Sequence, residues 1–77
     1  MTDYAWKETQ RDGFTELVLD CPLRIGEHRP VILWSIAAGR AYANSISGYS
    51  RTFDNLTDAK AYAGNVDGQR FVRGRRS

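Results

Sequence analysis

The chain has 77 residues, a net charge of +2 and 42% hydrophobic residues, which suits one small globular domain. Its one cysteine and one histidine, Cys21 and His28, are too few for an internal disulfide or a Cys/His metal site. Acidic residues near the start argue against a signal peptide, and the longest apolar stretch, residues 31–38, is too short to span a membrane. We therefore expect a cytoplasmic protein with no cofactor and no membrane partner.

Charge is divided unevenly along the chain. Residues 1–66 contain seven Lys/Arg and eight Asp/Glu, whereas the remainder has four arginines against Asp67 alone. A nearly neutral body followed by a basic end suggests an anionic partner for that end. We expect a single domain at residues 1–68 and a basic tail at residues 69–77.

Residues 4–10 and 14–21 are predicted to be two strands joined by Asp12-Gly13. This dipeptide favours a two-residue type I′ turn, in which both central residues have positive φ. The turn fixes the register and places Trp6 opposite Leu19. One face of this hairpin then carries the larger apolar residues, namely Tyr4, Trp6, Leu17, Leu19 and Cys21.

A second hairpin is predicted after residues 22–30, a loop that contains two prolines and a glycine. It consists of residues 31–38, the tight turn Gly39-Arg40, and residues 41–47, which residues 49–53 are expected to continue. This turn places Ile36 opposite Ala43.

One helix is predicted after the sheet, with Thr57 as its N-cap and Asp67-Gly68 at its end. The elements together predict an α+β fold, with an antiparallel sheet of two β-hairpins (three or four strands) and one C-terminal helix packed on one face. The apolar stripe of the helix is expected to meet the larger apolar residues of the sheet. The expected core comprises Trp6, Leu17, Leu19, Ile32, Trp34, Ile36, Phe53, Leu56, Ala59, Tyr62, Ala63 and Val66.

Few residues suggest catalysis. Glu27-His28 stands in a loop, where adjacent side chains rarely point at one target, so a solvated histidine is the favoured interpretation. Nothing in the sequence lowers the pKa of Cys21, which we interpret as a small core residue. Asp54 and Asp58 flank the helix start, where they suit the helix dipole. The glycines are scattered singly rather than gathered in a phosphate-binding loop, and we predict neither an enzyme nor a small-molecule substrate.

The face of the sheet away from the helix is predicted to be apolar, which is unusual for a one-sided antiparallel sheet. Its residues are Phe14, Val18, Val31, Leu33, Tyr42 and Ile46. Three explanations are open: the tail residues Phe71 and Val72 fold over it, two copies pack face to face as a homodimer, or a partner protein docks there. We favour a partner or a dimer, because two tail residues cannot cover six.

Arginines form a second candidate surface, which would bind nucleic acid. It comprises Arg51, Arg70, Phe71, Arg73, Arg75 and Arg76, in which the guanidinium groups suit phosphates and the phenyl ring suits a base. A disordered, solubilising terminus is the equally weighted alternative for the tail.

Residues 51–62, Arg-Thr-Phe-Asp-Asn-Leu-Thr-Asp-Ala-Lys-Ala-Tyr, resemble the end of AP2-like DNA-binding domains, which also occur at the N-termini of phage integrases. Trp34 is similar to an upstream tryptophan of that family. The resemblance implies a three-stranded sheet that enters the major groove of DNA, followed by a helix. The chain as a whole resembles small accessory proteins of bacteriophages, which implies that it modulates a host or phage macromolecule by binding it.

The leading hypothesis is therefore a non-enzymatic, phage-type accessory protein that binds a host or phage protein through the apolar face. The basic tail would steer the association electrostatically. Nucleic-acid binding through the arginines is the alternative, and a structural subunit of an assembly is the second alternative.

Overall fold

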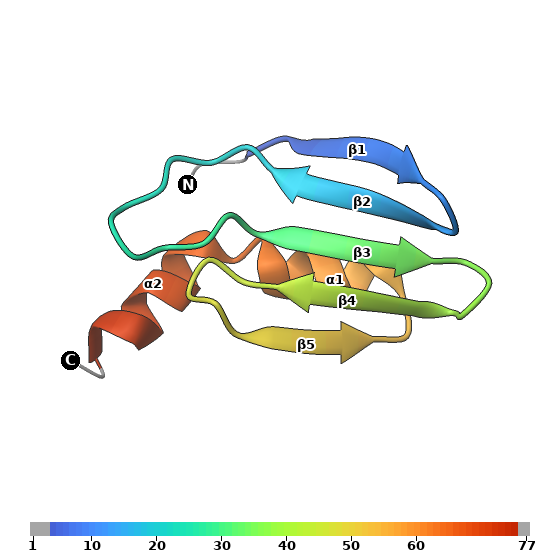
Figure 1. Cartoon of the computed structure of the whole chain (residues 1–77). Coiled ribbons are helices and arrows are strands. Elements are labelled where there is room, and N and C mark those ends of the chain that lie inside the picture. The colour runs from blue at the N-terminus through green and yellow to red at the C-terminus, as the bar shows by residue number, and fades with distance from the viewer. Residues whose placement is uncertain (1–3, 76–77) are drawn as a thin grey trace.

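The computed structural model describes the backbone of residues 4–75 and the side chains of residues 4–70. Five strands are followed by two helices (Figure 1). Their bounds are β1 Trp6–Arg11, β2 Phe14–Leu19, β3 Val31–Ser35, β4 Arg40–Asn44, β5 Ser50–Phe53, α1 Leu56–Ala63 and α2 Val66–Arg75.

The strands form one antiparallel sheet in the order β1-β2-β3-β4-β5, so strands that follow each other in the chain lie side by side. Helix α1 packs against β3, β4 and β5 on one face and lies behind these strands in Figure 1. The predicted α+β class is confirmed, with five strands rather than three or four. Among the described residues, no helix is long and apolar enough to cross a membrane.

The first hairpin has the predicted register. Trp6 pairs with Leu19, and Arg11 pairs with Phe14 on either side of the two-residue turn. The turn itself differs from the prediction, because only Gly13 has positive φ, at 89°, and no described non-glycine residue does. Positive φ at the second central residue alone suits a type II turn rather than type I′.

The second hairpin has a different register from the one predicted. Ala43 pairs with Ile32 rather than with Ile36, because β3 stops at Ser35 and a four-residue loop replaces the tight turn. Two hydrogen bonds close this loop: Gly39 N–H donates to Ser35 O (2.9 Å), and Ala38 N–H donates to Ser35 Oγ (3.2 Å). Ile36 therefore leaves the sheet and is 81% exposed, so its assignment to the core was wrong.

Strand β5 is separate from β4 because the chain turns at residues 45–49. The Ser45 N–H donates to Tyr49 O (2.8 Å), and Gly48, with φ 90°, supplies the left-handed conformation that the turn requires. Asn44 then pairs with Ser50. Residues 49–53 thus form a fifth strand instead of continuing the fourth.

The C-terminal part forms two helices rather than one. Asn55, not Thr57, caps α1, since its side chain accepts the Asp58 N–H (2.8 Å). Helix α1 ends at Gly64, and α2 passes through Gly68, where the single helix was predicted to stop. Gly68 lacks the Cβ that would collide with the Asn65 side chain, and Asn65 Oδ1 accepts the Gly68 N–H (3.3 Å). The predicted boundary between domain and tail therefore falls inside a helix.

The core lies between α1 and the sheet. Ala59 and Ala63 of α1 meet Ala41 and Ala43 of β4, and these small side chains let helix and sheet approach closely. Around them lie the larger residues Leu17, Ile32, Trp6, Trp34, Phe53, Leu56 and Tyr62. A second cluster, Leu19, Cys21, Ile46 and Val66, joins the end of the sheet to the start of α2. Apart from Ile36, every residue predicted for the core packs in one of these two clusters.

Candidate protein-binding face

The face of the sheet opposite α1 is called the open face here. Leu17, Ile32 and Ala43 are buried beneath α1, so the alternation of side chains along each strand directs their chain neighbours to the open face. The apolar patch on this face consists of Phe14, Val18, Val31, Leu33 and Tyr42.

Pairing brings most of the apolar patch into one block. Val18 lies opposite Val31 and Leu33 lies opposite Tyr42, while Val31 and Leu33 are consecutive residues of this face on β3. Leu33 is 36% exposed and Tyr42 49% exposed, so water reaches the middle of the block. Phe14, 37% exposed, stands apart at the turn end of β2.

Ile46 was predicted for this face, and that prediction was wrong. Ile46 has no exposed surface and packs with Leu19, Cys21 and Val66 on the other side of the sheet. Strand β4 ends at Asn44, so Ile46 lies in the following turn, where its carbonyl accepts the His28 N–H (2.9 Å). The predicted alternation failed because the strand ends at Asn44 and does not continue to residue 47.

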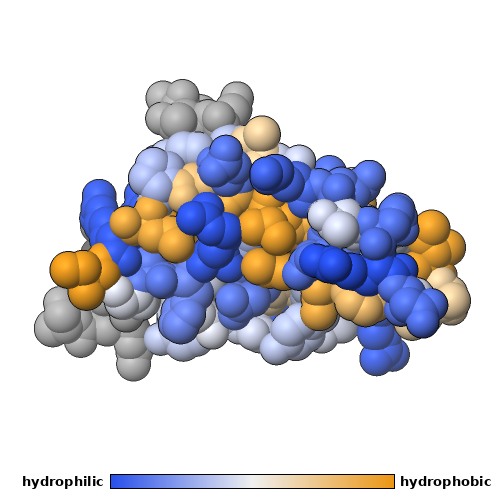
Figure 2. Space-filling model, turned by 45° about the horizontal axis from the view of Figure 1, so that its top comes forward, coloured by the Kyte–Doolittle hydropathy of each residue, from blue (hydrophilic) through white to orange (hydrophobic). Residues whose placement is uncertain are grey.

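Polar and charged side chains surround the apolar patch. On β1 the same face carries Lys7, Thr9 and Arg11, and Arg11 forms an ion pair with Glu16 of β2 (Nη2–Oε1 2.8 Å). Figure 2 shows hydrophobic residues across the middle of the molecule, interrupted by hydrophilic ones. An apolar centre with a polar rim is the usual construction of a protein–protein contact.

Arg70 is not available as part of a phosphate-binding surface. Its Nε donates to Glu27 Oε2 (2.7 Å), and its Nη2 donates to Glu27 Oε1 (3.0 Å) and to Pro22 O (2.6 Å). The Arg70 side chain is 14% exposed and that of Glu27 is 7% exposed. This ion pair fastens α2 to the loop between β2 and β3. The hydrogen bonds from Arg70 also hold the pKa of Glu27 below its ordinary value.

The other residues of the predicted nucleic-acid surface are dispersed or undescribed. Arg51 pairs with Ala43, so it belongs to the α1 side of the sheet, where its guanidinium lies 5.6 Å from the centre of the Phe53 ring. Phe71, Arg73 and Arg75 belong to α2, and their side chains are outside the described residues, as is Arg76. Arg51 and Arg70 thus contact different parts of their own chain, and they do not form one shared surface.

The residues considered for catalysis do not form a reactive group. Cys21 is buried, and desolvation raises the pKa of its thiol, with the nearby charges of Arg29 and Arg70 acting against that rise. A raised pKa keeps the thiol protonated and a weak nucleophile at neutral pH. His28 lies against Gly48, and Glu27 is engaged by Arg70. Within residues 4–70, no three His, Cys, Asp or Glu side chains are grouped to hold a metal ion.

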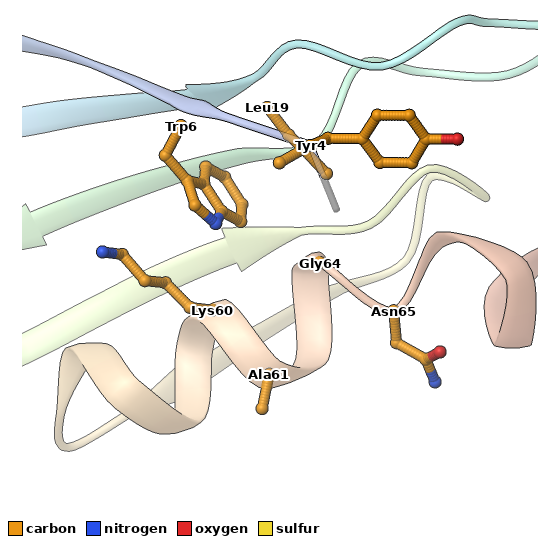
Figure 3. Close-up of a pocket in the computed structure, with 7 residues that line it drawn as sticks. All are labelled: Tyr4, Trp6, Leu19, Lys60, Ala61, Gly64 and Asn65. Atoms are coloured by element: carbon orange, nitrogen blue, oxygen red, sulfur yellow. The ribbon is translucent and has the colours of Figure 1, made fainter. Parts of the chain in front are cut away.

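A cavity of about 390 Å³ lies between α1 and the first hairpin. It arises because α1 covers β3 to β5 and leaves the same side of β1 and β2 partly uncovered. Figure 3 shows the Trp6 indole extending from β1 toward α1, with the Lys60 side chain beside it. Ala61 and Asn65 point away from the sheet, and the hollow is open to solvent.

No protein-family model, curated protein or solved structure matches this chain.

Proposed function

We propose that this chain is a non-enzymatic accessory protein and that a partner protein, of phage or host origin, docks on its apolar patch. The observation that carries the proposal is the block of Val18, Val31, Leu33 and Tyr42, whose members are adjacent across three central strands and partly exposed. Apolar surface removed from water by a partner contributes roughly 25 cal/mol per Å² before the costs of association.

The residue types in the apolar patch suit a protein partner. Tyr42 offers a large ring with a polar tip, and tyrosine is enriched among the residues that dominate binding energy. Val18, Val31 and Leu33 supply stiff or compact side chains on a rigid sheet, so little conformational entropy is lost on binding. Lys7 and Arg40 lie at the edges, where they would favour an acidic rim on the partner.

The experiment mixes the tagged wild type, Leu33→Asp and the control Thr57→Asp with cell lysate. Each is recovered by affinity purification, and the proteins that come with it are identified by mass spectrometry. Both variants add one carboxylate at an exposed position, but Thr57 lies on α1, away from the open face. A protein that is recovered with the wild type and Thr57→Asp, and lost with Leu33→Asp, supports docking on the patch. Circular dichroism establishes that each variant is folded, and Tyr42→Asp replaces Leu33→Asp if the latter unfolds.

Two other results would identify a different binding partner. A doubled mass in light scattering that Leu33→Asp reduces to the monomer would identify a second copy as the occupant. Retention of nucleic acid at low salt, with affinity that falls steeply as salt rises, would favour the arginines instead. Equal recovery of every captured protein by Leu33→Asp and the wild type would refute the proposal.

A further inference from the structure

Strand β1 forms one edge of the sheet, and no other described strand lies on its outer side. Among residues 4–75, it pairs with β2 alone. The Ala5 carbonyl accepts the Asp20 N–H (2.9 Å), so the alternation of an antiparallel ladder directs residues 5, 7, 9 and 11 toward β2. The N–H and C=O groups of Trp6, Glu8 and Gln10 therefore point outward.

This edge lacks two of the usual obstacles to a further strand, a bulge and a proline, and its charged residues select which strand can pair. All six residues from Trp6 to Arg11 pair in an unbroken register with β2, so the strand has no bulge, and it contains no proline. The opposite edge, β5, is only four residues long. Of the two edges, β1 therefore offers the longer template for backbone pairing.

A second copy of the chain fits this edge poorly. Two antiparallel β1 strands related by a twofold axis must place residues of the same face opposite each other. Two such registers overlap the six residues of β1 most fully. The first places Glu8 opposite Glu8, and the second places Lys7 opposite Arg11. Both oppose like charges, which destabilises cross-strand pairs. The charges that discourage self-pairing instead favour a strand of opposite charge.

We propose that β1 accepts an extended segment of a partner protein as a sixth strand, and that acidic residues opposite Lys7 and Arg11 select this segment. Lys7 and Arg11 both lie on the open face, with Thr9 between them on that face. Lys7 forms no ion pair among the described residues, and the Arg11 side chain is 53% exposed, which leaves room for a second acid beside its ion pair with Glu16. Glu8 lies on the other face and disfavours an acid opposite itself. The selected segment therefore carries acids on one face and neutral or basic residues on the other.

The test places a designed strand beside β1. The hexapeptide Glu-Thr-Thr-Lys-Glu-Val is fused ahead of Met1 through a Gly/Ser linker of about six residues, which raises its effective concentration to the millimolar range. In an antiparallel pairing its two glutamates lie opposite Arg11 and Lys7, and its lysine lies opposite Glu8. The readout is amide hydrogen exchange, residue by residue, in the full chain with and without the fusion.

The expected result is an alternating pattern. The outward amides of Trp6, Glu8 and Gln10 should exchange at least about tenfold more slowly in the fusion, whereas those of Lys7 and Thr9 are already protected by β2. A fusion with lysines in place of both glutamates should give less protection. Alternation at every second residue is specific to backbone pairing, so loose charge attraction cannot produce it.

A matched variant separates backbone pairing from other contacts. Glu8→Pro in the acidic fusion removes an outward N–H that the hairpin does not use, so the fold should persist and the added protection should disappear. If that variant unfolds, Lys7→Glu decides instead, because it leaves one attractive and one repulsive charge pair in each fusion and should therefore remove the preference for the acidic fusion.

Three results would overturn the proposal: unchanged outward amides, equal protection by the acidic and lysine fusions, or protection in the unfused chain that grows with its concentration. The last result would show pairing between copies. Leu33→Asp should leave the alternating pattern intact, so failure of the edge proposal is distinguishable from failure of docking on the apolar patch.

Discussion

The ion pair between Arg70 and Glu27 predicts how firmly α2 is attached to the rest of the protein. Arg70→Met keeps an unbranched apolar stem but removes three hydrogen bonds, two to the Glu27 carboxylate and one to Pro22 O. One hydrogen bond to Glu27 survives, from the Arg24 N–H (2.7 Å). Breaking a surface pair costs up to about 1 kcal/mol and breaking a buried pair about 3–5 kcal/mol. For this nearly buried pair with one remaining donor, we expect a loss of about 2 kcal/mol in the free energy of unfolding.

A loss of this size lowers the Tm of a domain of this length by roughly 8–16 °C in a thermal melt followed by circular dichroism. The control is Arg24→Met, which removes a neighbouring arginine side chain but leaves the backbone donor to Glu27 in place. An unchanged Tm for Arg70→Met, or an equal fall for Arg24→Met, would refute the assignment of Arg70 as the attachment of α2.

The effect of Arg70→Met should also depend on pH. Arg70 lowers the pKa of folded Glu27 below its ordinary value of 4.5, mainly by hydrogen bonding. A carboxyl group with a lowered pKa contributes stability that is fully present above the ordinary pKa and is lost as the pH falls through the folded value. The difference in Tm between the wild type and Arg70→Met should therefore be largest at neutral pH and shrink as the pH falls below 4.5 and through the lower pKa of folded Glu27. A pH-independent difference would contradict the ion pair as its cause.

Three further predictions test the fold. Asn55→Ala should cost about 1 kcal/mol in the free energy of unfolding, measured in urea, and Thr57→Ala should cost less, because Asn55 is the N-cap; the reverse order would contradict the observed helix start. Ile32→Ala should cost about 2–5 kcal/mol in the same assay, whereas Ile36→Ala should change little, since Ile36 is exposed; equal losses would restore the predicted register. Cys21 should react with a thiol reagent far more slowly in the folded protein than in denaturant, because its thiol is buried; equal rates would contradict that burial.

The two hairpins show what local sequence determines and what it does not. Asp12-Gly13 favours a two-residue turn between strands in which apolar and polar residues alternate. The predicted register of that hairpin is confirmed. Gly39 is also a turn residue, but Ser35 accepts hydrogen bonds from both Ala38 and Gly39, and this local closure favours a longer loop. The register moves by an even number of residues, so the faces of Ile32 and Leu33 were still predicted correctly.

Contacts between distant parts of the chain account for the remaining differences. Glu27 and Arg70 are 43 positions apart, and no local pattern indicates that they pair. Ile46 alternates correctly for the open face, yet the turn after Asn44 directs it inward against Val66. The separation of α1 from α2 depends on Asn65, whose side chain accepts the Gly68 N–H at the start of α2. Taken alone, Gly68 indicates the end of a helix.

Docking on the apolar patch is tested most directly by cross-saturation NMR with the protein recovered by the wild type. Methyl groups of the labelled chain lose signal when a saturated partner lies against them. Docking predicts losses at Val18, Val31 and Leu33, with the Ile32 methyls beneath α1 unaffected. Losses confined to residues outside the open face, such as the exposed Ile25, would contradict it.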